Sequence, residues 1–338
     1  MKNWIKSEIE QDDIIISSRV RLARNIKGIP FPHRLNPLKS KDIIDNIENN
    51  FKKDDYNFNT IKLWENNDFD NRIYLEKHLI SNKLLVNKDR AAFITNSDET
   101  ISIMINEEDH IRIQAISSGF NLKEVYNQAS LVDDKLEEKL SYAFSEKLGY
   151  LTSCPTNCGT GLRASVMIHL PALSMEKEMN KILNYLAQLG ITIRGLYGEG
   201  SKIQGDLYQI SNQITLGLSE EEIINNLTAI VEQIKKSEFT AREKLYTNYK
   251  YELQDKIFRS FGILKSSIIM SFTEMSELLS NVRMGIELGL INNIPHSIIN
   301  ELLLNCSPSY ISKTFNETDE KFINIKRAEI IKEKLKFL

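Results

Sequence analysis

The sequence predicts a domain of mixed strands and helices followed by a domain that is largely helical. Up to about residue 218, short strand-like runs alternate with helical stretches, whereas from about residue 238 onward nearly every segment has helical spacing. A chain of 338 residues is long enough for about two domains, each with its own core. We therefore predict domains at residues 1–235 and 236–338, with no Pro- or Ser-rich linker between them.

The strands of the first domain are predicted from short apolar runs with an alternating pattern. Such runs occur at residues 14–19, 61–64, 91–95, 101–105, 111–116, 162–169, 191–196 and 207–215. Ile101, Ile103 and Ile105 alternate with other residues, and Ile111 and Ile113 repeat the pattern after a five-residue acidic connection. These two runs predict an antiparallel pair joined by a hairpin.

Helices are predicted where apolar residues recur every three or four positions. A first helix spans residues 122–148 and can end at Gly149, and a second spans 176–189 and can end at Gly190. A third begins at Ser219, because Ser219 and Glu222 form a capping box ahead of an apolar run. The later helices are expected at residues 238–258, 271–288, 297–304 and 320–337.

The composition favours a protein of the cytoplasm. Acidic and basic residues nearly balance, 46 against 43, which argues against a nucleic-acid surface. The longest apolar runs are far shorter than the ~20 residues that cross a bilayer, and the first residues lack the hydrophobic block of a signal peptide. Three cysteines are too few for a disulfide scaffold. Cys154 and Cys158 have no nearby His and fall short of the four ligands of zinc, so no metal ligand is predicted.

A Gly-Thr-Gly turn at residues 159–161 is a candidate anion-binding element. It is not a Walker A loop, because no Lys-Ser or Lys-Thr pair follows the glycines. Alone it is equally the turn that leads into a strand. Cys154 precedes it and Arg163 follows it, and a guanidinium can clamp phosphate bidentately. His110 with Cys154 would suggest a Cys/His hydrolase, but no third, orienting partner is evident.

Five arginines beside unusual loops form a second candidate group. Each one alone would be an ordinary surface or ion-paired arginine. Arg19 and Arg21 alternate and so share a strand face, Arg112 follows the acidic connection, Arg163 follows the glycine turn, and Arg194 lies in a strand. Together they suit a polyphosphate held by arginine instead of by a P-loop.

Acidic residues form the third group. Glu107, Glu108 and Asp109 share one turn, and Glu199 lies in a glycine-flanked loop. The plainer interpretations are a solvated hairpin tip, a Mg²⁺ site and a loop charge. The sharper hypothesis is a pair of carboxylates that bind and deprotonate a cationic substrate.

Taken together, these motifs resemble the phosphagen (guanidino) kinases. The resemblance is carried by residues 17–25 (SSRVRLARN), 106–112 (NEEDHIR) and 154–166 (CPTNCGTGLRASV). Within that superfamily the chain is similar to the bacterial protein arginine kinases over nearly its full length. The segments specific to that branch are 75–81 (LEKHLIS), 194–201 (RGLYGEGS) and 209–217 (QISNQITLG).

The resemblance implies an α+β fold, an antiparallel sheet flanked by helices as in the phosphagen-kinase and glutamine-synthetase-like domains, followed by an α-helical domain that forms a homodimer. It implies that Glu108 and Glu199 contact the substrate guanidinium, with Cys154 beside them. The residues that it assigns to the nucleotide are Ser17, Ser18, Arg19, Val20, Arg21, His78, Arg112, Arg163, Ala164, Ser165, Val166, Met167, Arg194, Gly195, Leu196, Tyr197 and Gly198.

The chemistry of the implied reaction explains these residue types. Removing a proton from an arginine side chain at pH 7 would cost about 8 kcal/mol, because its pKa lies above 12. Two carboxylates that orient the guanidinium spread this cost if the proton leaves as the N–P bond forms. A Cys154 thiolate would add a third negative contact, while arginines and Mg²⁺ would neutralise the phosphate oxygens of ATP.

Three functions remain to be distinguished. A kinase of arginine in proteins comes first, a kinase of free arginine or another small guanidino compound second, and an inactive phosphoarginine-binding adaptor third. The metabolite kinases carry a sizeable helical domain ahead of the Ser-x-Arg-x-Arg segment, whereas here only 16 residues precede Ser17. The family further implies an activator protein and a Clp-type ATPase and protease as partners in a stress response.

Two positions depart from the family pattern. Cys158 stands where a Val or Leu is usual, and it should pack there as a small apolar residue. The family's Arg-Asp-x-x-Arg-Ala phosphoarginine motif is replaced at residues 323–328, where Ile323 and Asn324 precede Arg327 and Ala328. Without the first Arg and the Asp, a charge-assisted clamp is lost, which puts regulation by phosphoarginine in doubt.

Overall fold

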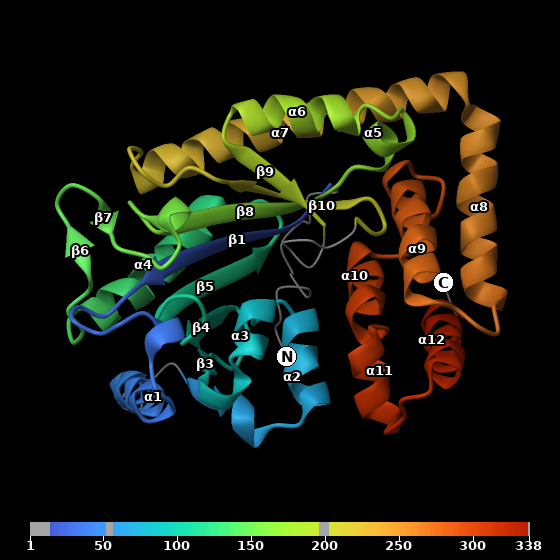
Figure 1. Cartoon of the computed structure of the whole chain (residues 1–338). Coiled ribbons are helices and arrows are strands. Elements are labelled where there is room, and N and C mark those ends of the chain that lie inside the picture. Colours follow the sequence, from blue (N-terminus) through green and yellow to red (C-terminus); the bar gives the residue numbers. More distant parts are fainter. Residues whose placement is uncertain (1–13, 52–56, 196–202, 337–338) are drawn as a thin grey trace.

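The computed structural model describes residues 14–51, 57–195 and 203–336. Within these ranges, one eight-stranded sheet with its helices precedes a group of C-terminal helices (Figure 1). The strand order is β2-β3-β4-β5-β1-β8-β10-β9, and every neighbouring pair is antiparallel. The predicted α+β class with an antiparallel sheet is confirmed.

The strands of this sheet correspond to the eight predicted segments. Their bounds are β1 Ile15–Arg24, β2 Asn59–Lys62, β3 Ala92–Thr95, β4 Ile101–Ile105, β5 Ile111–Ser118, β8 Leu162–His169, β9 Ile191–Arg194 and β10 Leu207–Asn212. The expected pair is β4 and β5, with Ile103 opposite Ile113. β1 is longer than predicted because it pairs with β5 and β8 as far as Arg24 and Leu22, respectively.

The predicted helix 122–148 was too long. Helix α4 spans Leu122–Glu137, and a hairpin of β6 (Phe144–Ser145) and β7 (Gly149–Tyr150) follows it. Gly149 adopts the left-handed region with φ +68°, and Phe144 packs edge-on against Tyr150 at 5.2 Å. The hairpin therefore pairs residues whose apolar spacing alone suggested another helical turn.

The remaining helices of the first region flank the sheet. They are α1 Pro37–Phe51, α2 Asp68–Glu76, α3 Asn82–Val86, α5 Pro171–Met175, α6 Met179–Gln188 and α7 Glu220–Asn248. The capping box of Ser219 and Glu222 is confirmed at the start of α7. The predicted helix 238–258 is divided, because Tyr249 leaves helical geometry between α7 and α8. The domain boundary predicted at residue 235 thus lies inside α7, and the division into domains stays a prediction.

The two faces of the sheet differ because side chains alternate along each strand. In β1, Val20 and Leu22 point into the main core, whereas Arg19 and Arg21 line a cavity on the opposite face. Helix α4 covers the core face at β1 and β5, and α7 covers it at β8 and β10 (Figure 1). On the opposite face, polar and charged side chains line the cavity, and Phe93 of β3 belongs to a separate apolar cluster.

The C-terminal helices form a second core beside the sheet (Figure 1). They are α8 Lys250–Ser266, α9 Phe272–Glu287, α10 His296–Asn305, α11 Pro308–Phe315 and α12 Glu320–Leu335. Leu303 and Leu304 of α10 pack on Ile16 and Met167, at one end of the polar face of the sheet. None of the helices in the described ranges is long and apolar enough to cross a membrane.

A buried group of paired charges, which we call the interface network, joins the C-terminal helices to the sheet region. Glu287 of α9 contacts Arg242 of α7 at 2.6 Å, Arg283 at 3.3 Å and His169 of β8 at 3.8 Å. Arg242 also contacts Glu238, which accepts two backbone N–H groups of α5 at 3.0 Å. Burial by itself raises the pKa of Glu287, but His169 and Arg242 outweigh it and lower the pKa to about 2.

Candidate active site

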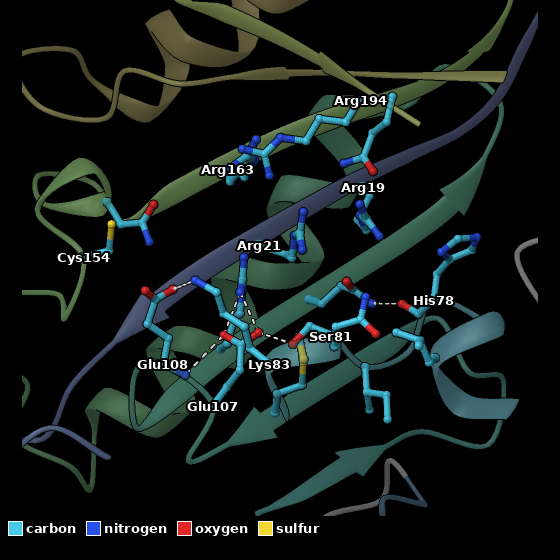
Figure 2. Close-up of a pocket in the computed structure, with 18 of the residues that line it drawn as sticks. Arg19, Arg21, His78, Ser81, Lys83, Glu107, Glu108, Cys154, Arg163 and Arg194 are labelled. Carbon is cyan, nitrogen blue, oxygen red and sulfur yellow. Dashed lines mark hydrogen bonds and ion pairs between the residues drawn. The ribbon is translucent and has the colours of Figure 1, made fainter. Parts of the chain in front are cut away.

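A polar cavity of about 450 Å³ lies on the open face of the sheet (Figure 2). Strands β1, β4, β5, β8, β9 and β10 form its floor, and α2, α3 and nearby loops form its walls. The side chains that line it are Arg19, Arg21, Leu75, His78, Ile80, Ser81, Asn82, Lys83, Met104, Glu107, Glu108, Arg112, Gln114, Cys154, Thr156, Asn157, Arg163, Arg194 and Gln209. The five predicted arginines therefore meet in one place.

Three of these arginines, Arg19, Arg21 and Arg163, form what we call the arginine cluster. Arg21 lies directly opposite Arg163 in the pairing of β1 with β8. Burial, Arg112 and Arg163 together lower the pKa of Arg19 to about 9. Burial, Arg19, Arg112 and Arg163 likewise lower the pKa of Arg21. In the described ranges no acceptor lies within hydrogen-bonding distance of the buried Arg21 Nε. A half-buried cluster of like charges with a spare donor is suited to an anion.

Arg112 differs from the cluster because it has a carboxylate partner. Its Nη1 atom contacts Glu107 Oε1 at 2.7 Å and Oε2 at 2.6 Å, and the Ser81 hydroxyl donates to the same carboxylate. Burial alone would raise the pKa of Glu107, but Arg112 and Ser81 outweigh it, so the pKa stays below its ordinary value. Sequence reasoning placed Glu107 in the acidic turn without a role of its own, and the structure makes it the anchor of Arg112.

His78 borders the cavity near Arg19 (Figure 2). Its backbone is in the left-handed region with φ +61°, and its carbonyl accepts a hydrogen bond from Gln114 Nε2 at 2.7 Å. Burial, Arg19 and Arg21 lower its pKa to about 3, so the imidazole is neutral at pH 7. It can therefore contact a nucleotide as a neutral ring in a strongly positive site.

Glu108 occupies the acidic end of the cavity. Its carboxylate contacts Lys83 Nζ of α3 at 2.9 Å, with the Glu108 side chain 23% and the Lys83 side chain 54% exposed. Figure 2 shows Glu108 and Cys154 toward one end of the cavity and His78 toward the other. The side chain predicted to hold a substrate cation thus already faces a cation of the protein itself.

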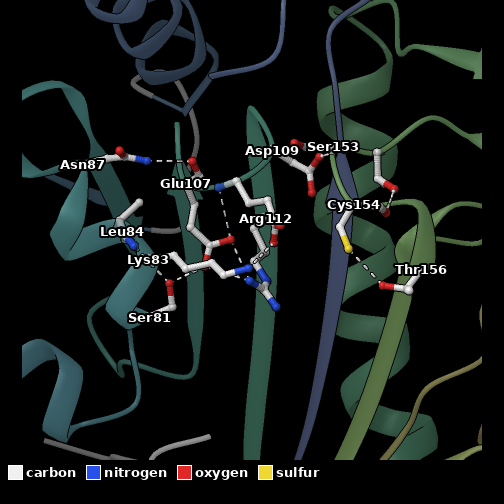
Figure 3. A network of polar contacts seen from close by, with 12 residues as sticks. Ser81, Lys83, Leu84, Asn87, Glu107, Asp109, Arg112, Ser153, Cys154 and Thr156 are labelled. Atoms are coloured by element: carbon white, nitrogen blue, oxygen red, sulfur yellow. Dashed lines mark hydrogen bonds and ion pairs between the residues drawn. The ribbon is translucent and has the colours of Figure 1, made fainter. Parts of the chain in front are cut away.

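Cys154 stands on the wall opposite α3 (Figure 3). Its Sγ lies 3.0 Å from Thr156 Oγ1. The backbone N–H of Ser153 donates to Asp109 Oδ1 at 2.7 Å, which ties the cysteine wall to the acidic turn. Because Asp109 follows Glu108 directly, one buried carboxylate holds the two predicted substrate contacts near one another.

Several residues assigned to the nucleotide lie elsewhere. Val20, Ala164 and Val166 are buried in the main core, and Ser18 donates to Gly119 O at 2.8 Å. Ser17 and Met167 are buried without lining the cavity, Ser165 lies 3.4 Å from Arg19 Nε, and Gly195 ends the described stretch after β9. The remaining assigned residues, Leu196, Tyr197, Gly198 and the catalytic candidate Glu199, lie outside the described residues. The roles of all these positions stay predictions.

Some cavity residues had no role in the sequence prediction. Gln114 could have been found, since it lies two positions after Arg112 on the same strand face. Gln209 belongs to a segment that the resemblance singled out, whereas Lys83 carries no sequence signal. His110 is structural: its ring nitrogens contact Pro30 O at 2.9 Å and Ile26 N at 3.1 Å, which leaves no role as the base of a hydrolase.

Cys158 faces Thr152, whose hydroxyl lies 3.3 Å from its Sγ, and it is absent from the residues that line the cavity. Among the described residues no cluster of His, Cys, Asp and Glu could hold a metal ion. The arrangement therefore offers a set of cations for phosphates at the centre of the cavity and, at one end, a carboxylate and a thiol for a cationic substrate.

Comparison with known proteins finds the same chemistry in two matched regions. Residues 39–241 match the ATP:guanido phosphotransferase, C-terminal catalytic domain. Residues 250–338 match the protein-arginine kinase McsB C-terminal domain. The two matches meet close to the end of α7, where the two hydrophobic cores also meet.

Similar proteins extend over the whole chain. A protein-arginine kinase of Clostridium acetobutylicum is 56% identical over 340 residues, covering 99% of this chain and 100% of that protein. A protein-arginine kinase of Bacillus velezensis is 43% identical and covers 99% of this chain and 93% of that protein. Among solved structures, lombricine kinase superposes with a TM-score of 0.59 at 27% identity over 67% of each chain. A duplicated taurocyamine kinase from Schistosoma mansoni gives 0.61 at 27% identity, over 69% of this chain and 35% of that one.

Proposed function

We propose that this chain, which belongs to the protein-arginine kinase family of ATP:guanido phosphotransferases, holds ATP with its arginine cluster and the substrate guanidinium with Glu108 and Cys154. It transfers the γ-phosphoryl group of ATP to arginine residues of proteins. The P–O bond to ADP breaks, an N–P bond forms, and the proton that the guanidinium loses passes to Glu108 and from there to solvent. Glu199 is the second carboxylate of this proposal and lies outside the described residues.

The observation that carries the proposal is the division of one cavity into a cationic part and an acidic end. Arg19, Arg21 and Arg163 would neutralise the phosphate oxygens, where a single arginine is worth about 10³–10⁵ in rate in other phosphoryl-transfer enzymes. Glu108 and Cys154 would orient the guanidinium and stabilise its charge until the proton leaves. Both halves open into the same space, as an in-line transfer requires.

Mg²⁺ is part of the proposal as a companion of ATP. Mg²⁺ usually keeps several waters and binds through phosphates with one or two carboxylates, so it needs no dedicated cluster of protein ligands. The Glu107 carboxylate is already bound by Arg112 and Ser81. We therefore assign the substrate contact in this turn to Glu108, which pairs with Lys83 in the free protein. Mg²⁺ would supply charge neutralisation at the transferred phosphoryl group.

The test compares two substrates and one matched pair of variants. The protein is incubated with Mg-ATP and either an arginine-rich protein or free arginine, and the product is measured at neutral pH because P–N bonds are acid-labile. We expect phosphate on protein arginine. Glu108→Gln should lower kcat by about 10²-fold or more, since it removes charge from the substrate contact. Phosphate on free arginine alone, or full activity in this variant, would contradict the proposal.

Glu301→Gln is the control for that variant. Glu301 of α10 contacts Lys334 at 3.2 Å with exposures of 19% and 47%, close to those of the pair formed by Glu108 and Lys83. It lies away from the cavity lining. Its loss should leave kcat unchanged, because it removes an equivalent ion pair without touching the site.

The setting of the enzyme is proposed from the family. We expect a homodimer formed through the C-terminal helices, an activator protein, a cytoplasmic location, and delivery of modified proteins to a Clp-type protease in a stress response. Size-exclusion chromatography with light scattering tests the dimer. Co-purification with a Clp ATPase in the presence, but not the absence, of Mg-ATP and substrate tests the delivery.

Regulation by phosphoarginine at α12 is not part of this proposal. Arg327 is buried and donates to Cys306 O and Met270 O, both at 2.8 Å, and to the Asn324 side chain. Ile323 and Ala328 of the same altered motif are buried in the C-terminal core. The remaining arginine of the motif thus ties α12 to the end of α10 and to the segment ahead of α9, so we expect no response of kcat to added phosphoarginine.

A further inference from the structure

Thr215 holds the wall that carries Cys154, although it does not line the cavity itself. It follows β10 and is 5% exposed. Its hydroxyl lies 2.8 Å from Thr156 O and 2.7 Å from Cys158 O, so one buried donor serves two carbonyls on either side of Asn157. Thr215 therefore lies outside the site but holds in place the segment that lines the cavity with Cys154, Thr156 and Asn157.

The main chain of Thr215 completes this attachment. Its carbonyl accepts the backbone N–H of Thr160 at 3.1 Å and the Thr160 hydroxyl at 3.3 Å. Gly159 passes so close that a Cβ atom there would lie 2.2 Å from Thr215 O, and its φ of +104° is one that glycine readily adopts. The glycine turn of the sequence thus serves a close approach to Thr215 as well as any anion.

Thr215 is itself fixed to the strands that carry the arginines. Asn212 at the end of β10 accepts the backbone N–H of Ala164 at 2.8 Å and donates to Leu162 O at 3.0 Å and Ile214 O at 3.1 Å. β10 pairs on one side with β8, which holds Arg163, and on the other with β9, which holds Arg194. A short series of hydrogen bonds therefore holds the wall that carries Cys154 at a fixed position relative to the strands that carry the arginines.

We propose that Thr215 is a positioning residue for phosphoryl transfer, which sets the distance between the Cys154 wall and the arginine strands. The inference rests on the proposed function, in which this wall faces the guanidinium. Without the Thr215 hydroxyl, Thr156 O and Cys158 O lose a buried donor and the wall shifts. The guanidinium is then misaligned with the γ-phosphoryl group, while ATP still binds to strands that have not moved.

The test uses Thr215→Val, which keeps the branched shape and removes the hydroxyl. We expect kcat on a protein substrate to fall by about 10- to 100-fold, since a misplacement of about 1 Å can cost 10²-fold. The KM for ATP should stay within about twofold, because the arginine cluster is carried by other strands. The rate at which iodoacetamide labels Cys154, followed by peptide mass spectrometry, should change in parallel with kcat.

Two further variants make the result specific. Thr215→Ser restores the hydroxyl and should recover kcat and the labelling rate. Thr228→Val removes a hydroxyl that lies 2.8 Å from Ile224 O in the middle of α7, an equivalent side-chain bond far from the cavity, and should change neither. If Thr215→Val folds poorly, the serine variant still decides, since loss of kcat despite its hydroxyl would overturn the proposal.

The outcomes separate this inference from the proposed function. Wild-type kcat in Thr215→Val overturns the positioning role, as does an equal loss of kcat and ATP affinity in the folded variant. If Glu108→Gln loses activity and Thr215→Val does not, only the inference fails. If Glu108→Gln stays active, the assignment of the guanidinium site itself is wrong.

Discussion

Two groups of arginines in this protein are built in opposite ways, one buried between helices and one half-buried in the cavity. In the interface network, Arg242 and Arg283 both contact Glu287, and Arg242 also contacts Glu238. In the arginine cluster, Arg19 and Arg21 lie beside other arginines, and burial together with these neighbours lowers the pKa of both. The first group has its counter-ions within the chain, and the second is suited to counter-ions that arrive with a ligand.

The difference shows that the interface network contributes to stability and that the arginine cluster is suited to ligand binding. A paired buried charge is costly to break, because removing one partner leaves the other charge uncompensated. A like-charge cluster costs stability in the free protein and returns it when phosphates bind. Arg112 stands between these cases, since Glu107 holds it in place within the cavity. Variants that remove one arginine from each group should therefore have opposite effects on stability.

The largest expected effect is on activity in the arginine cluster. Arg21→Met should lower kcat/KM by about 10³-fold or more, as expected for an arginine at a transferred phosphoryl group. The same change should raise the melting temperature of the free protein by about 1–2 °C, the equivalent of about 1 kcal/mol for a chain of this length, because it removes a half-buried cation whose Nε finds no acceptor among the described residues. Kinetics and thermal unfolding without nucleotide check both results. A lowered melting temperature would contradict the comparison.

Arg242→Met is the counterpart in the interface network. It should lower the free energy of unfolding by about 3–5 kcal/mol, because Glu287 and Glu238 would lose their shared partner. Denaturant titration measures this directly. Per folded molecule, kcat should change little, since the network does not line the cavity. Equal loss of stability in both variants would remove the distinction between the two groups.

The next expected effect is a loss of stability of the folded protein in acid. The folded-state pKa of Glu287 is lowered to about 2, and burial lowers the pKa of His169 below its ordinary 6.5. The stability that Glu287 contributes is thus present above about pH 4.5 and is lost as the pH falls toward 2. Below pH 6.5 the unfolded chain binds a proton at His169 before the folded protein does, which also lowers stability. Both contributions to stability therefore decrease as the pH falls.

Glu287→Gln should remove most of this acid dependence when unfolding is measured from pH 7 to pH 3. The control is Glu277→Gln, an exposed position on the same helix α9, which should retain it. An unchanged pH profile in Glu287→Gln would mean that the network does not supply the counter-ions that stabilise this interface.

The smallest expected effect concerns Lys83, which pairs with the predicted substrate contact Glu108. Lys83→Met should lower the KM for protein arginine by about two- to fivefold, because an exposed ion pair is worth about 0.2–1 kcal/mol. In this variant the substrate guanidinium would no longer have to displace the Lys83 ammonium before it contacts Glu108. Steady-state kinetics at saturating ATP check this, with Lys334→Met as the matched control. A raised KM would instead make Lys83 part of substrate binding.

How far the sequence could predict the site depended on distance along the chain. Alternation placed Arg19 and Arg21 on one face, and the structure brings both into the cavity. The partner of Arg112, only five residues away, could have been inferred from the acidic turn, whereas the contact of Lys83 with Glu108 spans 25 residues and has no motif. The end of α4 was misplaced because apolar spacing in residues 138–148 suits both a helix and the hairpin that forms.

The sequence by itself determined the family, the eight strands of the sheet and the set of arginines, because these depend on local composition and on alternation along each strand. Only the tertiary structure decided which charges are paired. Glu287 reaches His169 and Arg242, and Thr215 reaches Thr156, across 118, 45 and 59 residues, through register and packing that no local pattern contains. Coulomb and hydrogen-bond energies depend on such distances, so pairing is a property of the folded chain.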